Sequence, residues 1–194
     1  MFPLDFPLGI LKAHARPNAR VLDPFCGRGT TNFAARLLGL RTVGIDASRV
    51  AAAATQAKLV APTPREIIGA AKAILRRKRR SIEIPEGEFW RLAYHADVLR
   101  ELCLLRDALL RGGIAAHVAS ALRGIILGAL HGPLGHTKHS YFSNQCPRTF
   151  GPKPAYAIKF WKERGLLPPR VDVLGVIAER AHRYYGSALP KVVG

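Results

Sequence analysis

The chain has 194 residues, and 48% of them are hydrophobic, which is enough for one packed domain or for one domain with a large insertion. Lys and Arg number 30 against 13 Asp and Glu, so the formal net charge is +17 and a polyanionic partner, above all nucleic acid, is expected. An anionic membrane surface or a ribosomal contact is the alternative that the charge leaves open.

Cysteine spacing and hydropathy bear on the compartment. Cys26, Cys103 and Cys146 show no pairing pattern, which favours a reducing cytoplasm over an oxidising compartment. The first residues lack the basic segment of a signal peptide. The most apolar long stretch, 114–130, contains His117 and is too short and too polar to span a bilayer. We therefore expect a cytoplasmic protein with no membrane partner.

The first part of the chain alternates between helix and strand patterns. Apolar runs bounded by turn residues predict strands over 20–24 and 41–46. Helical periodicity predicts helices over 6–15, 30–39 and 49–59. Ser48 is expected to cap the last of these helices. This order predicts an α/β fold, with residues 1–60 forming a Rossmann-like but incomplete half-sheet.

A glycine turn lies between the first predicted strand and the helix after it. Gly27 and Gly29, separated by one residue, let the backbone bend tightly and let a ligand approach without meeting a Cβ atom. Asp46 falls about 20 residues beyond this turn, at the tip of the second predicted strand. A carboxylate in that position is placed to accept hydrogen bonds from ribose hydroxyls. The pattern predicts a nucleoside-binding site.

The identity of that nucleoside follows from what the turn lacks. Asn32 stands where a dinucleotide fingerprint has its third glycine, and no Gly-Lys-Ser/Thr follows as it does in a phosphate loop. Asp23, directly before the turn, would repel a pyrophosphate. S-adenosyl-L-methionine carries an ammonium and a sulfonium group, so it fits two acids better than NAD or ATP does.

These residues carry a family resemblance. Asp23–Thr31, together with Gly44–Ser48, resembles the cofactor-binding segment of DNA methyltransferases that modify exocyclic amino groups, adenine N6 or cytosine N4. Phe6–Leu11 resembles the short Phe-Pro helix that precedes this motif and closes over the methionine end of the cofactor. The resemblance is strong over 6–58 and thinner over 141–162, and some tRNA guanine-N2 methyltransferases carry a near copy of the motif.

The resemblance implies S-adenosyl-L-methionine as the cofactor and assigns roles to the residues around the turn. Asp23 and Gly27 are expected to line its methionine part, Phe25 to pack beside it and Asp46 to hold the ribose. The full set of expected cofactor-binding residues is Phe6, Pro7, Asp23, Pro24, Phe25, Gly27, Gly29, Thr30, Asp46, Ala47 and Ser48. Cys26 is expected only to pack.

Residues 61–188 read as a large, mostly helical insertion that contacts nucleic acid. No good strand pattern occurs in it, and helices are expected over 63–80, 97–111, 114–130, 154–165 and 170–186. Thr63 is the expected N-cap of the first, with Pro64 at its first helical position. That helix ends in the cations Arg76, Arg77, Lys78, Arg79 and Arg80, which are either a solvated helix end or a phosphate-contacting patch.

The loop over 143–154 is the second candidate for contact with nucleic acid. Tyr141, Phe142 and Phe150 alternate with cations, which suits base stacking and phosphate pairing. A similar Ser-Asn-Gln-x-Pro-Arg-Thr stretch occurs in some bacterial methyltransferases. We predict contacts from Asn144, Arg148 and Lys153. The alternative is a rigid surface loop, and His131, His136, His139 and Cys146 match no familiar zinc spacing, so no metal is expected.

The catalytic motif of the resembling family is absent from the sequence. Residues 189–194 read as the start of a third strand, and no Asp/Ser/Asn-Pro-Pro-aromatic tetrapeptide occurs anywhere in the chain. In the family that motif grips the extruded base. The expectation is therefore the N-terminal part of a longer methyltransferase, or one half of a split enzyme whose second polypeptide supplies the motif, with no catalytic residue in this chain.

Three functions remain open at this point. The leading one is an S-adenosyl-L-methionine-binding part of a DNA amino-methyltransferase, inactive alone. The second is an RNA methyltransferase with the same cofactor half. The third is a basic nucleic-acid-binding protein that keeps the fold without the cofactor.

Overall fold

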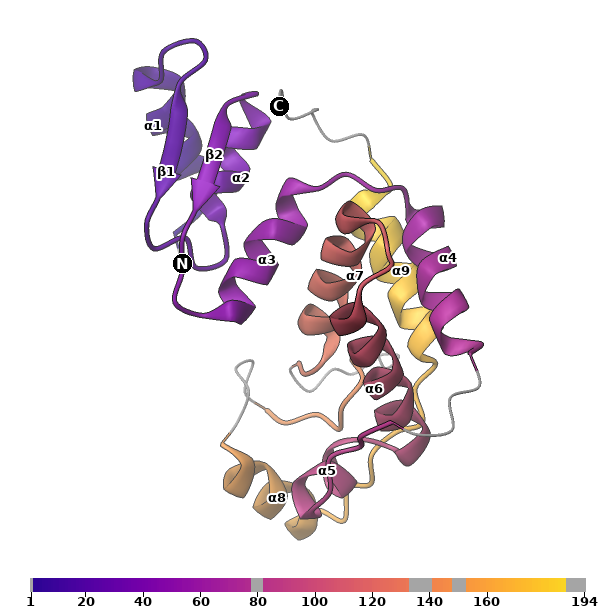
Figure 1. Cartoon of the computed structure of the whole chain (residues 1–194). Coiled ribbons are helices and arrows are strands. Elements are labelled where there is room, and N and C mark those ends of the chain that lie inside the picture. The colour runs from indigo at the N-terminus through magenta and orange to yellow at the C-terminus, as the bar shows by residue number, and fades with distance from the viewer. Residues whose placement is uncertain (1, 78–81, 133–140, 148–152, 188–194) are drawn as a thin grey trace. The chain divides into compact units, whose positions relative to one another are not determined.

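The computed structural model describes residues 2–77, 82–132, 141–147 and 153–187 (Figure 1). The chain divides into two compact units. One, here called the sheet unit, holds the described residues within Met1–Ile67, Ala115–Leu127 and Ala181–Gly194. The other, here called the helical unit, holds those within Ile68–Ile114 and Gly128–Arg180.

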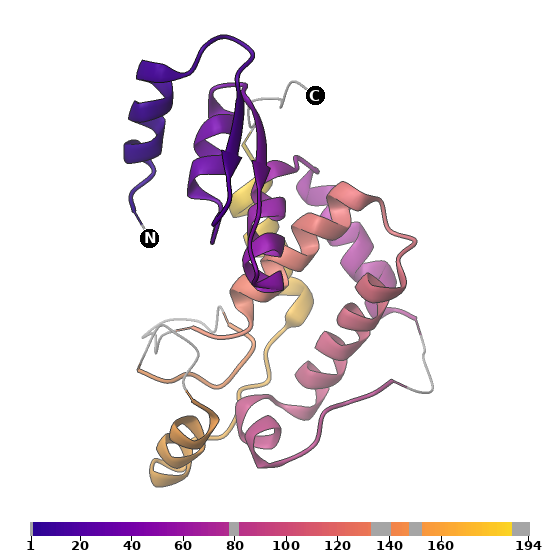
Figure 2. The same ribbon diagram turned by 60° about the vertical axis from the view of Figure 1, so that its left-hand side comes forward.

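Two parallel strands and the helix between them form the centre of the sheet unit. Strand β1 (Arg20–Asp23) pairs with β2 (Arg41–Gly44) in a register that runs from Arg20 opposite Arg41 to Asp23 opposite Gly44. Helix α2 (Thr30–Leu37) connects the strands and packs against both, and α1 (Asp5–His14) packs against α2 (Figure 2). Helix α3 (Arg49–Leu59) also contacts α2.

Among the described residues, helices cover only one face of this small sheet. On that face the Asn32 side-chain amide of α2 donates to the Thr42 hydroxyl at 2.7 Å, and Asn32 is completely buried. On the other face Leu22 and Val43, which pair across the ladder, are 62% and 58% exposed. Among the described residues, the chain is thus α/β with a two-stranded parallel sheet.

Each of the five predicted elements before residue 60 is present. The helix over 49–59 has the predicted bounds, and its N-cap is confirmed because the Ala51 amide donates to Ser48 Oγ at 3.3 Å. The second strand was predicted to reach Asp46 but ends at Gly44. Ile45 and Asp46, beyond its end, instead accept hydrogen bonds from the amides of Cys26 and Gly27.

Helix α7 (Ala116–Ala129) and the end of α9 (Val173–Tyr185) add later parts of the chain to the sheet unit. A Cβ atom added to Gly124 of α7 would lie 2.3 Å from the Cβ of Ala57, so the two helix backbones approach closely there. The Tyr185 hydroxyl donates to the Ala57 carbonyl at 2.7 Å, and burial raises the pKa of Tyr185 to about 12.

Helix α4 (Pro64–Leu75) begins with the predicted cap and ends earlier than predicted. The Thr63 amide and hydroxyl both donate to Glu66 Oε2 at 2.7 Å, which is a capping box. The prediction that this helix reaches Arg80 is wrong, because α4 ends at Leu75 and the Arg77 amide turns back to the Ile74 carbonyl. Cations four residues apart, such as Lys72 and Arg76, repel one another on a helix and oppose its continuation.

The helical unit is built largely from α6 (Ala96–Arg111), α5 (Glu88–Ala93), α8 (Pro154–Glu163) and the first part of α9. Leu99, Leu102 and Leu105 of α6 are buried, as their helical spacing predicts. The short helix α5 was not predicted. It packs against α8, with the rings of Phe89 and Trp161 5.9 Å apart.

The remaining predicted helices are present with slightly different ends. Helix α9 starts after Asp172 rather than at residue 170, because Asp172 Oδ1 accepts from the Gly175 amide and caps the helix. In the described part of the chain no strand follows β2, and the third strand predicted over 189–194 lies outside that part. None of the described helices has both the length and the apolarity needed to cross a bilayer.

Candidate functional site

The carboxyl ends of β1 and β2 bring Asp23 and Asp46 to the same edge of the sheet. Asp23 is the last residue of β1, and its carbonyl accepts from the Ile45 amide at 2.9 Å. The Ile45 carbonyl in turn accepts from the Cys26 amide at 2.9 Å. Because these bonds join the two chain segments just beyond the ladder, both acids flank the turn that follows β1.

The glycine turn depends on two left-handed backbone conformations. Gly27 has a φ of 52° and Gly29 a φ of 71°, a region that residues with a Cβ atom adopt at a cost. The Gly29 amide donates to the Cys26 carbonyl at 2.7 Å, and the Gly29 carbonyl accepts the first helical bond of α2, from Phe33. The turn therefore leads directly into the amino terminus of α2.

The Asp46 carboxylate accepts hydrogen bonds from the glycine turn and from the N-cap residue of α3. Its Oδ2 accepts from the Gly27 amide at 2.8 Å, and its Oδ1 accepts from the Ser48 amide at 2.8 Å. Each carboxylate oxygen can accept more than one hydrogen bond, so acceptor capacity remains for a ligand hydroxyl. Asp46 thus holds the turn in place as well as presenting a charge beside it.

Two residues of helix α3 donate hydrogen bonds to carbonyl groups of the turn, and the sequence interpretation missed both. The buried Thr55 hydroxyl donates to the Gly27 carbonyl at 3.2 Å, and Lys58 Nζ donates to the Arg28 carbonyl at 2.6 Å. Burial, and less strongly the Arg28 guanidinium, lowers the pKa of Lys58. The available signal was the (i, i+3) spacing of two polar residues in an otherwise alanine-rich helix.

Arg36 fixes the far end of α3. It is 1% exposed, and its Nη1 donates to the carbonyls of Lys58 at 2.5 Å and Val60 at 3.0 Å, where the helix leaves carbonyl groups without helical partners. Burial lowers the pKa of Arg36. Since Arg36 belongs to α2, these hydrogen bonds hold the carboxyl terminus of α3 against α2.

The other residues predicted to bind the cofactor differ in exposure. Phe25 is 88% exposed and Phe6 59% exposed, whereas Pro7 is buried in α1. Cys26 is buried, with its Sγ 3.5 Å from the Thr55 hydroxyl, in the packing position expected for it. Of the rest, Gly29 is buried, Gly27 and Thr30 are half-buried, and Pro24, Ala47 and Ser48 are exposed.

The described residues that were predicted to contact nucleic acid belong to the helical unit. Arg76 and Arg77 are exposed just after α4, and Lys153 is exposed at the start of α8. Four others, Lys78, Arg79, Arg80 and Arg148, lie outside the described residues. Their contact with nucleic acid stays a prediction.

Asn144 is an interior residue in this structure. It is 7% exposed, and its side-chain amide donates to the carbonyls of Leu92 at 3.1 Å and Leu166 at 3.3 Å. These bonds join two segments that the loop passes between. A direct contact of Asn144 with nucleic acid, which stays a prediction, would require its side chain to leave both carbonyls.

The described part of the loop, residues 141–147, packs inward. Phe142 is completely buried, so the prediction that it is available to stack on bases is wrong. Trp161 Nε1 donates to the Gln145 carbonyl at 2.9 Å. Ser143 Oγ lies 2.8 Å from His131 Nδ1, and burial lowers the pKa of His131.

The described residues contain no group of three or more side chains arranged to hold a metal.

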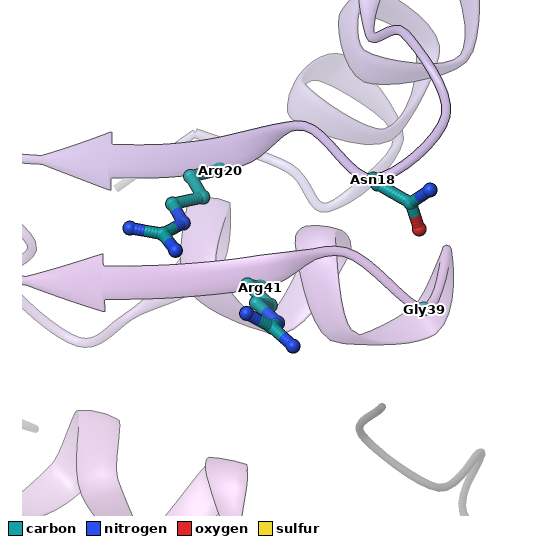
Figure 3. Close-up of a pocket in the computed structure, with 4 residues that line it drawn as sticks. All are labelled: Asn18, Arg20, Gly39 and Arg41. Atoms are coloured by element: carbon teal, nitrogen blue, oxygen red, sulfur yellow. The ribbon is translucent and has the colours of Figure 1, made fainter. Parts of the chain in front are cut away.

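A shallow cavity of about 220 Å³ lies at the opposite end of the sheet from the two acids. It is lined by Asn18, Arg20, Gly39 and Arg41, which belong to the starts of the strands and the loops before them (Figure 3). Its lining is cationic and shares no residue with the glycine turn.

Comparison with known proteins bears on the first part of the chain. A family model described as DNA methylase matches residues 1–57. The matched segment contains all the residues predicted to bind the cofactor. No curated protein and no solved structure matches the chain.

Proposed function

Because residues 1–57 belong to the DNA methylase family, we propose that this chain is the S-adenosyl-L-methionine-binding part of a DNA methyltransferase. Its target would be an exocyclic amino group, adenine N6 or cytosine N4. The observation that carries the proposal is the placement of Asp23 and Asp46 at one edge of the sheet, on either side of a glycine turn held by Asp46 itself.

The chemistry of this edge suits a cationic nucleoside. Two carboxylates favour a ligand that carries ammonium and sulfonium groups, and Asp46 retains acceptor capacity for ribose hydroxyls. Gly27 and Gly29 let the ligand approach the backbone without meeting a Cβ atom. Phe25, 88% exposed beside the turn, offers an aromatic surface against which the cofactor can pack.

When bound, the cofactor supplies an activated methyl group on its sulfonium. This chain's own part is to bind the cofactor and fix its orientation, with Asp46 on the ribose and Asp23 near the methionine end. Since the Pro-Pro-aromatic tetrapeptide is not in the sequence, we expect cofactor binding with little or no turnover by this chain alone. Turnover would need that motif, supplied by a longer form of this chain or by a second polypeptide.

Calorimetry with S-adenosylhomocysteine tests the cofactor proposal. The wild-type chain is expected to bind, Asp46→Ala to lose binding, and Phe25→Ala to bind roughly tenfold more weakly without a change in melting temperature, since Phe25 is mostly exposed. Asp5→Ala, which removes an exposed acid from α1, is the matched control and is expected to bind like the wild type. Absence of binding by the wild-type protein would overturn the proposal.

The substrate class is decided by a separate experiment. Labelled duplex DNA is competed with unlabelled duplex and with tRNA, and the proposal expects duplex DNA to compete better. Preferential competition by tRNA would favour an RNA methyltransferase. Salt-dependent DNA binding in a chain that does not bind S-adenosylhomocysteine would instead favour a non-catalytic nucleic-acid-binding protein.

A further inference from the structure

Helix α8 carries a row of stacked planar groups that reaches the surface of the helical unit. The rings of Tyr156 and Phe160 lie 22° from parallel, with their centroids 6.3 Å apart. The guanidinium carbon of Arg164, four residues further on, lies 4.1 Å from the centroid of the Phe160 ring. Phe160 is 7% exposed whereas Tyr156 is 41% exposed. The row therefore ends in an aromatic ring at the protein surface.

Tyr156 lies outside the buried face of α8. Ala157 and Trp161, four residues apart, are both buried and share one face of the helix. Trp161 contacts the Phe89 ring of α5, and the two helices lie side by side in the helical unit (Figure 1). Since Ala157 and Trp161 provide this packing, the exposed ring of Tyr156 can serve a planar ligand.

Cations stand at both ends of the row. Lys153 is the exposed N-cap residue of α8, and the exposed Arg164 is its C-cap residue. The helix dipole favours a cation at the carboxyl terminus and disfavours one at the amino terminus, where Lys153 makes no side-chain cap. Helix stability therefore accounts for Arg164 but not for Lys153, whereas attraction of an anionic ligand accounts for both.

The carboxylates near these cations leave a positive excess. Residues 153–164 include four cations and one acid. Glu163 pairs with Lys159 at 3.7 Å and with Arg164 at 3.8 Å, and Lys162 pairs with Glu88 at 2.5 Å. The side chains in these pairs are 42–75% exposed, and such pairs contribute at most about 1 kcal/mol each. Phosphate groups can therefore compete for the same cations.

We propose that the Tyr156 face of α8, formed by Lys153, Tyr156, Phe160 and Arg164, binds unpaired DNA. A base stacks on the Tyr156 ring, and backbone phosphates contact Lys153 and Arg164. Aromatic side chains beside cations hold single strands because unpaired bases expose their faces. An enzyme that extrudes its target base creates unpaired nucleotides of this kind. Only the choice of DNA over RNA rests on the proposed function, and the contact does not require the cofactor.

Fluorescence anisotropy with a labelled single-stranded oligodeoxynucleotide, and with the duplex of the same sequence, tests the stacking contact. Tyr156→Leu keeps an apolar side chain against Phe160 but removes the planar ring. It is expected to bind the single strand roughly tenfold more weakly, with duplex affinity unchanged within about twofold. Tyr156→Phe keeps the ring and is expected to bind the single strand like the wild type. The matched control, also expected to bind like the wild type, is Tyr184→Leu in α9, which removes a tyrosine that is 47% exposed and lies beside Arg183.

Lys153→Gln tests the phosphate contact and leaves the aromatic row intact. The slope of log K against log salt for the single strand is expected to become shallower by about 0.7, as for the loss of one phosphate contact. Lys12→Gln, which removes an exposed cation from α1, is expected to leave the slope unchanged. An unchanged slope in Lys153→Gln would overturn the phosphate contact, even if Tyr156→Leu proves too unstable to measure.

Three results would overturn the stacking contact. They are wild-type affinity for the single strand in Tyr156→Leu, an equal loss in Tyr184→Leu, and an equal loss for single strand and duplex, since stacking needs an unpaired base. Binding of an RNA of the same sequence at least about tenfold more tightly, with the same dependence on Tyr156, would overturn the choice of DNA. None of these measurements uses S-adenosylhomocysteine, so failure of the cofactor proposal and failure of this one are separately visible.

Discussion

Thr55 of α3 lies directly against Gly29 of the glycine turn. A Cβ atom added to Gly29 would be 2.6 Å from Thr55 Oγ1 and 2.9 Å from Thr55 Cβ, which no relaxed structure tolerates. Glycine at this position is therefore required by the packing of α3 as well as by its left-handed backbone. The turn is held from two directions, by Asp46 at the edge of the sheet and by Thr55 from the helix.

We predict that the Thr55 hydroxyl, rather than its shape, positions the turn for the cofactor. Thr55→Val keeps the shape but removes the donor to the Gly27 carbonyl, and should cost about 1 kcal/mol of unfolding free energy and weaken S-adenosylhomocysteine binding. Thr55→Ser keeps the donor and should retain the affinity, although it loses a buried methyl group. Equal affinity in the Val and Ser variants would show that the hydroxyl does not position the turn.

Gly124→Ala should destabilise the chain through the contact of α7 with α3. The new Cβ would lie 2.3 Å from the Cβ of Ala57, and overpacking of this kind costs about 1–3 kcal/mol. Gly128→Ala in the same helix is the control, because the one described atom that its Cβ would meet within 4 Å is Arg180 Nη1, at 3.8 Å. That control should be neutral or stabilising by up to about 1 kcal/mol, from helix propensity alone. Urea unfolding of the two variants measures the difference.

The capping box at the start of α4 should make stability depend on acid pH. Hydrogen bonds from Thr63, with a smaller contribution from His117, lower the pKa of Glu66 from 4.5 to about 2. A carboxyl group whose pKa is lower in the folded state stabilises fully above its unfolded value. Its contribution should therefore decline as pH falls from about 4.5 toward 2.

Denaturant midpoints of the wild type and Glu66→Gln, taken at pH 7 and pH 3, test that dependence. The wild type should have the higher midpoint at pH 7, and the gap should narrow at pH 3 because the Gln side chain does not titrate. Glu179→Gln, which changes an exposed glutamate of α9, should show no such narrowing. A gap that is constant with pH would contradict the role given to the Glu66 charge.

Asn144→Ala should cost about 2–3 kcal/mol of unfolding free energy, because it leaves the carbonyls of Leu92 and Leu166 without their donor. Lys153→Ala, which truncates an exposed side chain, should leave stability within about 0.5 kcal/mol of the wild type. Thermal and urea unfolding, run beside DNA-binding measurements, separate the two roles of Asn144. Loss of DNA affinity with unchanged stability would mean that Asn144 recognises nucleic acid and does not hold the loop.

Local features of the fold were predictable because their causes lie within a few residues along the chain. The caps at Ser48 and Thr63 depend on a hydroxyl and on amides three residues away, and both are present as predicted. The left-handed turn at Gly27 and Gly29 depends on the lack of a side chain. The helix predicted to reach Arg80 ends at Leu75, and hydrophobic periodicity takes no account of repulsion between cations such as Lys72 and Arg76.

The sequence by itself determined the α/β start of the chain, the glycine turn and the acids Asp23 and Asp46 that flank it, since strand, turn and cap each follow from neighbouring residues. Only the tertiary structure decided that Thr55 and Lys58 support the turn, that Asn144 lies inside, and that Arg20 and Arg41 stand opposite each other. These relationships join residues far apart in the chain. They arise from strand register and helix packing, which no local pattern specifies.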